Sequence, residues 1–338
     1  MASLALAYLN PGELTAHLAQ HAGRVLGVAA FGHNPPEANV PGYPLICIDM
    51  PVLGADTLYE VWTSSTPVAP ASNAGIRSAH NTDVLYGCFE TPQSPGESIE
   101  SATFRAYAKL FDFIDGAGYP HLWRIWHYFP RINAIENELE RYRGFNVGRH
   151  EAFLAKGRMI GGKNVPAACA LGSRGGPMAM YFLAGKQAGI ALENPRQTSA
   201  YHYPEQYGPR SPAFARAMLA GAGHDRKLFI SGTASIVGHA SQHAGDVAEQ
   251  ARETLVNIRA LLTQARHDGF DIPGQDPRLL LKVYLHRPDS LPLVRDQVNA
   301  AFGAMQQAVY LQADVCRSDL LLEIEGVCLY PRQTKNLP

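Results

Sequence analysis

The sequence of 338 residues has few of the features that mark secreted, membrane or nucleic-acid-binding proteins. Its five cysteines are an odd number without CxxC spacing, which argues against a disulfide framework or a zinc site. No apolar run approaches the roughly 20 residues that a membrane-spanning helix requires. The formal net charge is −1 and basic residues form no run, so there is no electrostatic footprint for nucleic acid. We therefore expect reduced thiols in a cytoplasmic protein that binds neither nucleic acid nor membrane.

The N-terminus also lacks the positive charge that opens a signal peptide, and Pro11 and Glu13 follow its apolar residues at once. Apolar residues make up 46% of the chain and charged residues 17%, a balance typical of a folded globular protein. The length corresponds to one large domain or two ordinary ones.

The order of predicted elements repeats along the chain. The first half has a strand at 83–89, a helix at 98–115, a strand at 121–129 and a helix at 136–154. The second half has a strand at 227–237, a helix from 246, a strand at 278–286, a helix at 289–302, and strands at 308–316 and 320–329. This order predicts an α/β fold in which helices cover one face of each sheet. We place the two halves at residues 1–160 and 161–338.

Two acids share one face of the last predicted strand. Alternation turns Leu322 and Ile324 to one side and Glu323, Glu325 and Val327 to the other. A carboxyl group in apolar surroundings is unusual, because burial disfavours its charged form. One interpretation is a carboxyl group with a raised pKa that donates a proton near neutral pH. The other, one acid satisfied by a partner and one exposed, stays open on this segment alone.

Six long segments together resemble a known family. Residues 313–329 (ADVCRSDLLLEIEGVCL) resemble the closing strand of Rid-type (YjgF-like) domains, and the Cys316-to-Glu323 spacing resembles the chorismatase family. The other segments are 124–133 (RIWHYFPRIN), 140–149 (ERYRGFNVGR), 199–204 (SAYHYP), 207–216 (YGPRSPAFAR) and 228–238 (LFISGTASIVG). The resemblance implies two fused Rid/YjgF-like halves, each a mixed sheet covered by helices on one face.

Chorismatases cleave chorismate to a ring product and pyruvate, and the resemblance assigns site residues for that reaction. Glu323 would protonate the enolpyruvyl group, with Glu325 as the second choice. Tyr142, Arg149, Tyr203 and Arg216 fall where the family holds its dianionic substrate. Arginine suits that task because its planar guanidinium binds carboxylates in a bidentate manner. No cofactor and no metal are implied.

Two further positions bear on the product. Cys316, at the end of the strand predicted at 308–316, matches the cysteine of the branch that makes 3-hydroxybenzoate, and alternation turns Arg317 to the opposite face. Ala234 stands where some hydroxybenzoate-forming members have glycine. The implied activity is cleavage of chorismate to a hydroxybenzoate and pyruvate. The hydroxybenzoate is 3-hydroxybenzoate, with 4-hydroxybenzoate open as a further product.

Other functions remain open at this point. One is a chorismate hydrolase that gives a dihydroxycyclohexadiene carboxylate and pyruvate. A second is a Rid-type enamine/imine deaminase, although the arginine that holds the carboxylate in those enzymes has no secure match here. A third is a ligand-binding module whose acid is structural. His239 and His243 have helical metal-ligand spacing, but Gly238 and Gly245 indicate a loop. We expect a monomer or a small homo-oligomer.

Overall fold

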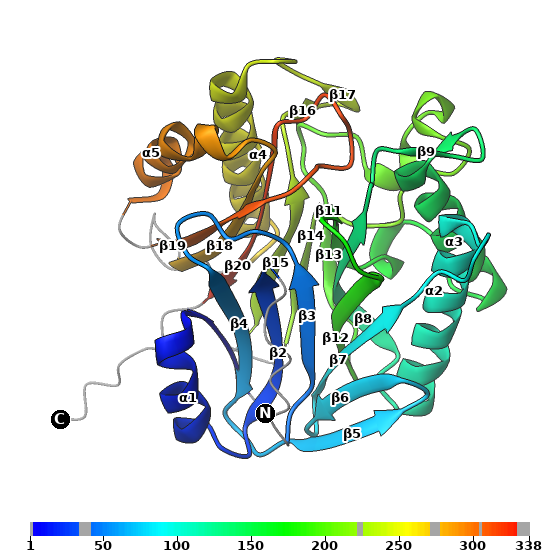
Figure 1. Ribbon diagram of the computed structural model, residues 1–338, viewed down its shortest axis with the longest axis vertical. Coiled ribbons are helices and arrows are strands. Elements are labelled where there is room, and N and C mark those ends of the chain that lie inside the picture. Colours follow the sequence, from blue (N-terminus) through cyan, green and yellow to red (C-terminus); the bar gives the residue numbers. More distant parts are fainter. Residues whose placement is uncertain (1–2, 34–41, 222–225, 271–277, 304–305, 330–338) are drawn as a thin grey trace.

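In the computed structural model, which describes residues 3–33, 42–221, 226–270, 278–303 and 306–329, three large β-sheets meet around a common centre (Figure 1). Helices cover the outer faces: α2 and α3 lie on the right in Figure 1, α4 and α5 at the upper left, and α1 at the lower left.

The sheet that comes second along the chain, after the N-terminal one, has six strands in the order β11-β8-β12-β7-β6-β5. Its elements are β5 (Ala69–Asn73), β6 (Ile76–His80), β7 (Val84–Thr91), α2 (Ile99–Gly116), β8 (His121–Pro130), α3 (Arg141–Ala155), β11 (Ala167–Ser173) and β12 (Met178–Gly185). The short hairpin of β9 (Ile135–Glu136) and β10 (Leu139–Glu140) precedes α3.

The third sheet has the order β13-β14-β15-β20-β18-β19. Its elements are β13 (Ile190–Leu192), β14 (Ala217–Ala220), β15 (Lys227–Thr233), α4 (Val247–His267), β18 (Arg278–Leu285), α5 (Leu291–Phe302), β19 (Gln306–Gln312) and β20 (Leu322–Leu329). A small hairpin of β16 (Ile236–Val237) and β17 (Ala240–Ser241) follows β15.

The two six-stranded sheets have one topology. Numbered along the chain within each sheet, the strands of both run in the order 1-2-3-6-4-5. In both, strands 4 and 5 are parallel and the other neighbours are antiparallel. The predicted α/β fold of two fused halves, each with helices on one face, is confirmed.

The boundary between the halves differs from the prediction at residue 160. β11 and β12 lie beyond that residue, yet they pair with β8 and β7 of the preceding half. A division that follows the sheets therefore falls between β12 and β13. The sequence could not place it, because strand pairing over long separations is decided in the folded sheet.

The N-terminal segment repeats part of the same plan. It contains β1 (Leu4–Leu9), α1 (Pro11–Gln20), β2 (Val25–Gly32), β3 (Leu45–Asp49) and β4 (Thr57–Ser64), in the sheet order β1-β4-β2-β3. That order equals 3-6-4-5 of the larger sheets, with β2 and β3 parallel. The chain thus contains two complete units and one truncated unit, and the truncated one was not anticipated.

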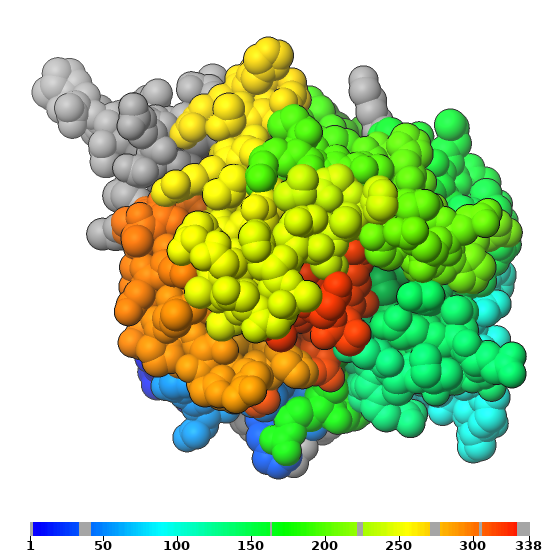
Figure 2. All heavy atoms as spheres, turned by 90° about the horizontal axis from the view of Figure 1, so that it is seen from above, coloured from blue at the N-terminus to red at the C-terminus, as the bar shows by residue number. Residues whose placement is uncertain are grey.

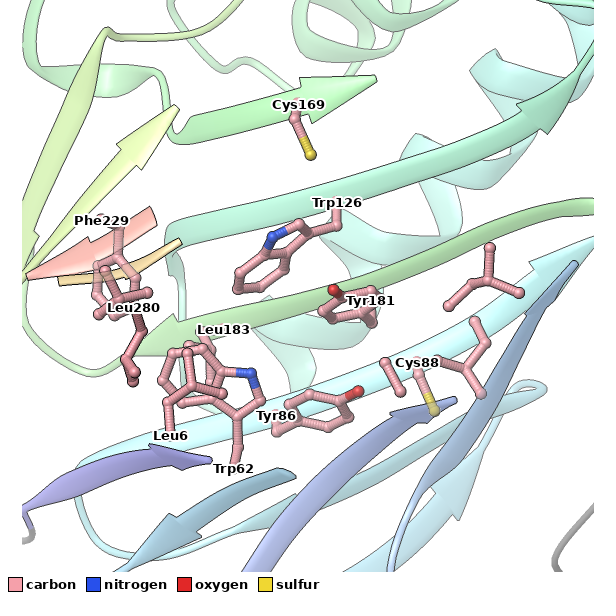
Figure 3. Packing of buried hydrophobic residues seen from close by; sticks show 14 of the residues in the cluster. Leu6, Trp62, Tyr86, Cys88, Trp126, Cys169, Tyr181, Leu183, Phe229 and Leu280 are labelled. Atoms are coloured by element: carbon pink, nitrogen blue, oxygen red, sulfur yellow. The ribbon is translucent and has the colours of Figure 1, made fainter. Parts of the chain in front are cut away.

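The inner faces of all three sheets share one core. Trp62 of β4, Trp126 of β8, Tyr181 of β12, Phe229 of β15 and Leu280 of β18 all belong to it (Figure 3). The Trp126 and Tyr181 rings stack with centroids 4.5 Å apart. Large aromatic side chains contribute most to such a core because each removes a large apolar area from water.

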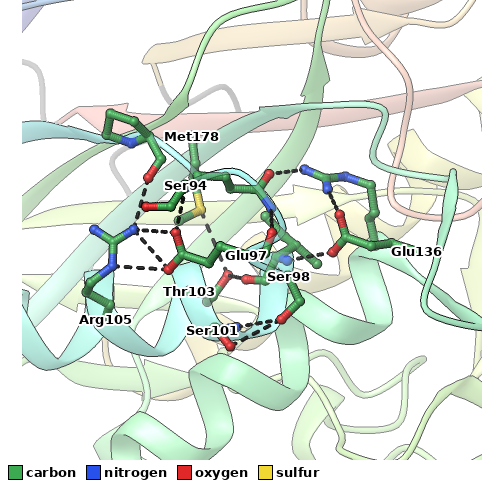
Figure 4. Close-up of polar contacts among 12 residues, drawn as sticks. Ser94, Glu97, Ser98, Ser101, Thr103, Arg105, Glu136 and Met178 are labelled. Atoms are coloured by element: carbon green, nitrogen blue, oxygen red, sulfur yellow. Dashed lines mark hydrogen bonds and ion pairs between the residues drawn. The ribbon is translucent and has the colours of Figure 1, made fainter.

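Local contacts fix the start of α2 and, through it, α3. Ser98 caps α2 by accepting a hydrogen bond from the Ser101 backbone N–H, and Arg105 binds the Glu97 carboxylate with two nitrogens (Figure 4). Glu136 accepts from the Ile99 backbone N–H and forms an ion pair with Arg141 at the start of α3. The orientation of α3 matters because it carries residues of the cavity described below.

A cluster of four buried charges lies where the sheets meet. The Lys282 ammonium on β18 is 2.6 Å from Glu60 of β4 and 2.8 Å from Glu325 of β20. Arg124 of β8 forms a second ion pair with Glu325. Each of these side chains is at most 3% exposed, so the two cations and two anions must neutralise one another.

We predict that Lys282→Met lowers the free energy of unfolding by about 3–5 kcal/mol, because it leaves buried carboxylates without their shared cation. Urea unfolding followed by circular dichroism measures the change. Lys186→Met, at an exposed position, is the matched control and should alter stability by no more than about 0.5 kcal/mol. Equal stability of the two variants would contradict the structural role of the cluster.

Candidate active site

A cavity of about 540 Å³ lies between the two complete units. Its wall includes Ala168 and Cys169 of β11 on one side and Gly232 of β15 on the other. The Ala168 backbone N–H donates to the Ser231 hydroxyl at 3.0 Å, which ties the two strands together. Seen from above, the red C-terminal segment reaches the surface between the green and yellow parts of the chain (Figure 2).

All seven site residues expected from the sequence line this cavity. They are Tyr142, Arg149, Tyr203, Arg216, Ala234, Cys316 and Glu323. They come from α3, from the segments before β14 and after β15, from the loop before β20, and from β20 itself. The fold therefore brings together residues that lie up to 181 positions apart in the sequence.

Glu323 is a buried acid that faces the cavity. It is 4% exposed, and its Oε1 atom has no hydrogen-bond partner among the described residues. Burial raises the pKa of Glu323 to about 8, because the charged form loses its hydration, while Arg124 and Arg216 act in the opposite direction. The carboxyl group therefore holds a proton near neutral pH, as a general acid requires.

A glycine makes room for this carboxyl group. A Cβ atom at Gly232 would overlap Glu323 Oε1 and would also lie 3.2 Å from the Cys169 Cβ. Gly232 does not have a positive φ, so the requirement is one of space and not of backbone conformation. Any larger side chain there would displace the acid.

Glu325 has a different environment although it shares the face of Glu323. It accepts a hydrogen bond of 2.6 Å from the Tyr284 hydroxyl, and it pairs with Lys282 and Arg124. A carboxylate with these partners is held in its charged form and has no proton to donate. The geometry favours Glu323 over Glu325 as the acid.

Arg149 and Arg216 supply fixed positive charge. Arg149 Nη2 donates to Asn146 Oδ1 at 2.7 Å, and Arg216 Nη2 donates to the Tyr203 hydroxyl at 2.7 Å. Both arginines are buried, and the Nε atom of each lacks a hydrogen-bond partner among the described residues. Buried guanidinium groups with unpartnered nitrogens are suited to an anionic ligand.

Cys316 lies in the loop between β19 and β20, since β19 ends at Gln312 and not at Cys316 as predicted. Burial and the nearby Glu323 raise the pKa of the Cys316 thiol to about 12. Burial also raises the pKa of Tyr142, which forms a hydrogen bond with Cys316. A thiol that stays protonated is a poor nucleophile, so this cysteine is suited to shaping the cavity.

Arg317 was placed wrongly by strand alternation. Because the segment is a loop, Arg317 also lines the cavity, with its guanidinium 4.0 Å from the Tyr207 ring centroid. It donates to the His239 backbone carbonyl at 2.9 Å. Sequence reasoning also missed Cys169, whose only signal was its place in a short apolar strand.

The two histidines with metal-like spacing have other partners. His239 Nδ1 is 3.1 Å from the Tyr207 hydroxyl, and His243 is 3.8 Å from Glu253. Within the described ranges, no group of three or more His, Cys, Asp or Glu side chains could hold a metal ion. Of the helices described here, none is long and apolar enough to cross a membrane.

Comparison with known proteins agrees with this arrangement. Residues 60–184 match the family model described as chorismatase FkbO/Hyg5-like, N-terminal. A 3-hydroxybenzoate synthase of Streptomyces hygroscopicus is 38% identical over 297 residues, which cover 85% of this chain and 86% of the relative. The chain belongs to the chorismatase family. A chorismatase of Streptomyces rapamycinicus is 35% identical over 296 residues, with the same coverage of both chains.

A solved structure supports the same assignment. A chorismatase crystal structure superposes with a TM-score of 0.87 at 33% identity, covering 97% of this chain and 99% of that one. The match extends over the truncated N-terminal unit and both complete units. The resemblance inferred from the six sequence segments is thereby confirmed at the level of the family and the fold.

We predict that Gly232→Ala lowers turnover by 100-fold or more, because the added methyl group displaces the Glu323 carboxyl from the cavity. Pyruvate release from chorismate measures the loss. The matched control is Gly116→Ala near the end of α2, where an added Cβ meets nothing within 4 Å. Full activity of the Gly232 variant would show that this carboxyl position is not needed.

Proposed function

We propose that this chorismatase-family protein is an enzyme that binds chorismate in the cavity and cleaves it to a hydroxybenzoate and pyruvate, with Glu323 as proton donor. The observation that carries the proposal is the state of Glu323. This buried carboxyl group has a pKa raised to about 8 and an unpartnered oxygen. It lines the same cavity as two buried arginines.

The cavity suits a dianion of this size. Arg149 and Arg216 bind the two carboxylates of chorismate, and each arginine offers an Nε–H that no described group uses. Tyr142 and Tyr203 flank them with hydroxyl groups. Because both guanidinium groups are already held by Asn146 or Tyr203 contacts, little side-chain freedom is lost on binding.

The reaction begins with transfer of the Glu323 proton to the methylene carbon of the enolpyruvyl ether. This step forms the methyl group of pyruvate and leaves an oxocarbenium ion, which the Glu323 carboxylate stabilises. For 3-hydroxybenzoate, the C4 hydroxyl oxygen, still bearing its proton, bonds to C3 as the C3–O bond breaks and pyruvate leaves. Its bond to C4 then breaks, and loss of the C3 proton to Glu323 makes the ring aromatic. Loss of the C4 proton without this transfer of oxygen gives 4-hydroxybenzoate instead. Hydroxybenzoate and pyruvate together contain the atoms of chorismate, so no oxidant and no net water is consumed.

The position of Cys316 supports 3-hydroxybenzoate as the product. Its protonated thiol lies beside Tyr142 and Glu323, where it orients the ring and does not form a covalent bond. The 38% identity to a relative named 3-hydroxybenzoate synthase favours the same product. Ala234 lines the cavity in the place of the glycine of some hydroxybenzoate formers, and on that ground 4-hydroxybenzoate is proposed as a minor product.

Hydrolysis is the second candidate reaction. If water attacks the oxocarbenium ion before the ring loses its proton, the products are a dihydroxycyclohexadiene carboxylate and pyruvate. Two relatives at 35% identity are named chorismatase without a stated product, and that name is compatible with hydrolysis. We further propose a cytoplasmic location, supported by five cysteines none of which forms a disulfide, and a monomer or small homo-oligomer.

We predict that Glu323→Gln reduces pyruvate release at least 100-fold, because the amide keeps the shape of the side chain but has no acidic proton. Glu100→Gln, at an exposed position of α2, is the control and should leave the rate unchanged. Near-normal turnover by the Glu323 variant would remove it from the role of acid.

We predict that Cys316→Ala still releases pyruvate but shifts the aromatic products away from 3-hydroxybenzoate, since the thiol orients the ring and takes no part in protonation. Chromatography of the products measures the ratio. Cys328→Ala, at a buried cysteine of the third unit outside the cavity, should keep the original ratio. Complete loss of pyruvate release in a folded Cys316 variant would indicate direct catalysis instead.

A further inference from the structure

The Arg124 guanidinium lies near the carboxyl groups of Glu323 and Glu325 but forms an ion pair with Glu325 alone among the described residues. Its Nη2 forms an ion pair with Glu325, and neither Nη1 nor Nη2 has a hydrogen-bond partner among the described residues. Glu323 lies on the same face of β20, two residues or about 7 Å away, and its Oε1 is also unpartnered. The guanidinium carbon lies 4.7 Å from the Trp126 ring centroid, which holds the cation in place.

We propose that Glu325 is a positioning residue that binds the Arg124 guanidinium and so withholds this cation from Glu323, leaving the Glu323 carboxyl with its proton. The consequence for catalysis rests on the proposed role of Glu323 as the acid. The claim about protonation concerns only the buried groups and is tested separately below.

The charge balance of the cluster supports this inference. Arg124 and Lys282 carry two positive charges, and Glu60 and Glu325 carry two negative charges. The cluster is therefore neutral without Glu323. If Glu325 lost its charge, Arg124 would have no carboxylate partner and ionisation of Glu323 would supply one, whereas loss of the Glu60 charge leaves both cations in contact with Glu325.

The other groups around Glu323 either are neutral or, like Arg216, form no ion pair with Glu325. The titratable or charged side chains that face it are Arg124 from β8, Tyr142 from α3, Cys169 from β11, Arg216 from before β14, Tyr284 from β18, and Cys316 from the loop before β20. Burial raises the pKa values of the two tyrosines and two thiols, so they are neutral near pH 7. Arg216 is held by Tyr203 and the Thr198 carbonyl. Arg124 is therefore the cation near Glu323 whose ion pairing depends on Glu325.

The test compares the pH dependence of kcat/KM for pyruvate release. In the unmodified enzyme the rate falls as pH rises through the pKa of Glu323, because the acid loses its proton. Glu325→Gln should move this fall at least one pH unit lower. The rate would then drop about tenfold on the alkaline side and stay unchanged well below the transition.

Two further variants make the test specific. Glu60→Gln removes the same charge from the far side of Lys282 and should leave the pH transition where it was, because Glu60 does not contact Arg124. Arg124→Gln combined with Glu325→Gln removes a whole ion pair and leaves Lys282 with Glu60. This double variant should move the transition upward. It also keeps the test available if Glu325→Gln alone fails to fold.

Titration of the Glu323 carboxyl carbon by ¹³C NMR gives its pKa without any turnover, with Glu323→Gln used to assign the signal. A downward shift in Glu325→Gln that is absent in Glu60→Gln and reversed in the double variant supports the inference. No shift, equal shifts in Glu325→Gln and Glu60→Gln, or a downward shift in the double variant would overturn it. Failure to release pyruvate alongside the expected NMR shifts would refute the proposed function but not this inference.

Discussion

The buried ion cluster at the junction of the three sheets is the interaction on which the rest of the structure depends. Lys282 forms ion pairs with Glu60 and Glu325, and Arg124 forms one with Glu325. These ion pairs connect four strands from three sheets. Such a cluster contributes less to stability than to specificity, because desolvation offsets most of the attraction while any missing partner is costly.

The truncated N-terminal unit contributes one carboxylate to this cluster. None of its described residues lines the cavity, but β4 provides Glu60, and Trp62 donates to Glu60 at 2.7 Å. Through Lys282 this unit holds β18 against its neighbour β20, the strand that carries Glu323. A segment without apparent chemistry in its sequence thus contacts, through Lys282, the strand that carries Glu323.

Two glutamates on one strand face show how environment assigns roles. Glu325 contacts two cations and a tyrosine hydroxyl, whereas Glu323 is buried with a raised pKa and an Oε1 atom that has no hydrogen-bond partner among the described residues. The same residue type two positions apart therefore has one environment that suits an anion and another that suits a protonated carboxyl group. The close approach of Gly232 completes the second environment.

The sequence by itself determined the family, the repeated α/β plan, and the side chains that meet in the cavity, because alternation and long motifs are local properties of the chain. It placed Cys316 on a strand and turned Arg317 away, since a loop between two apolar strands leaves no periodic signal. From the family resemblance it named Glu323 as the acid and Glu325 as the second choice. Only the tertiary structure separated the environments of these two glutamates, because the partners Arg124, Lys282 and Gly232 are distant in sequence and a pKa depends on what surrounds the group in space.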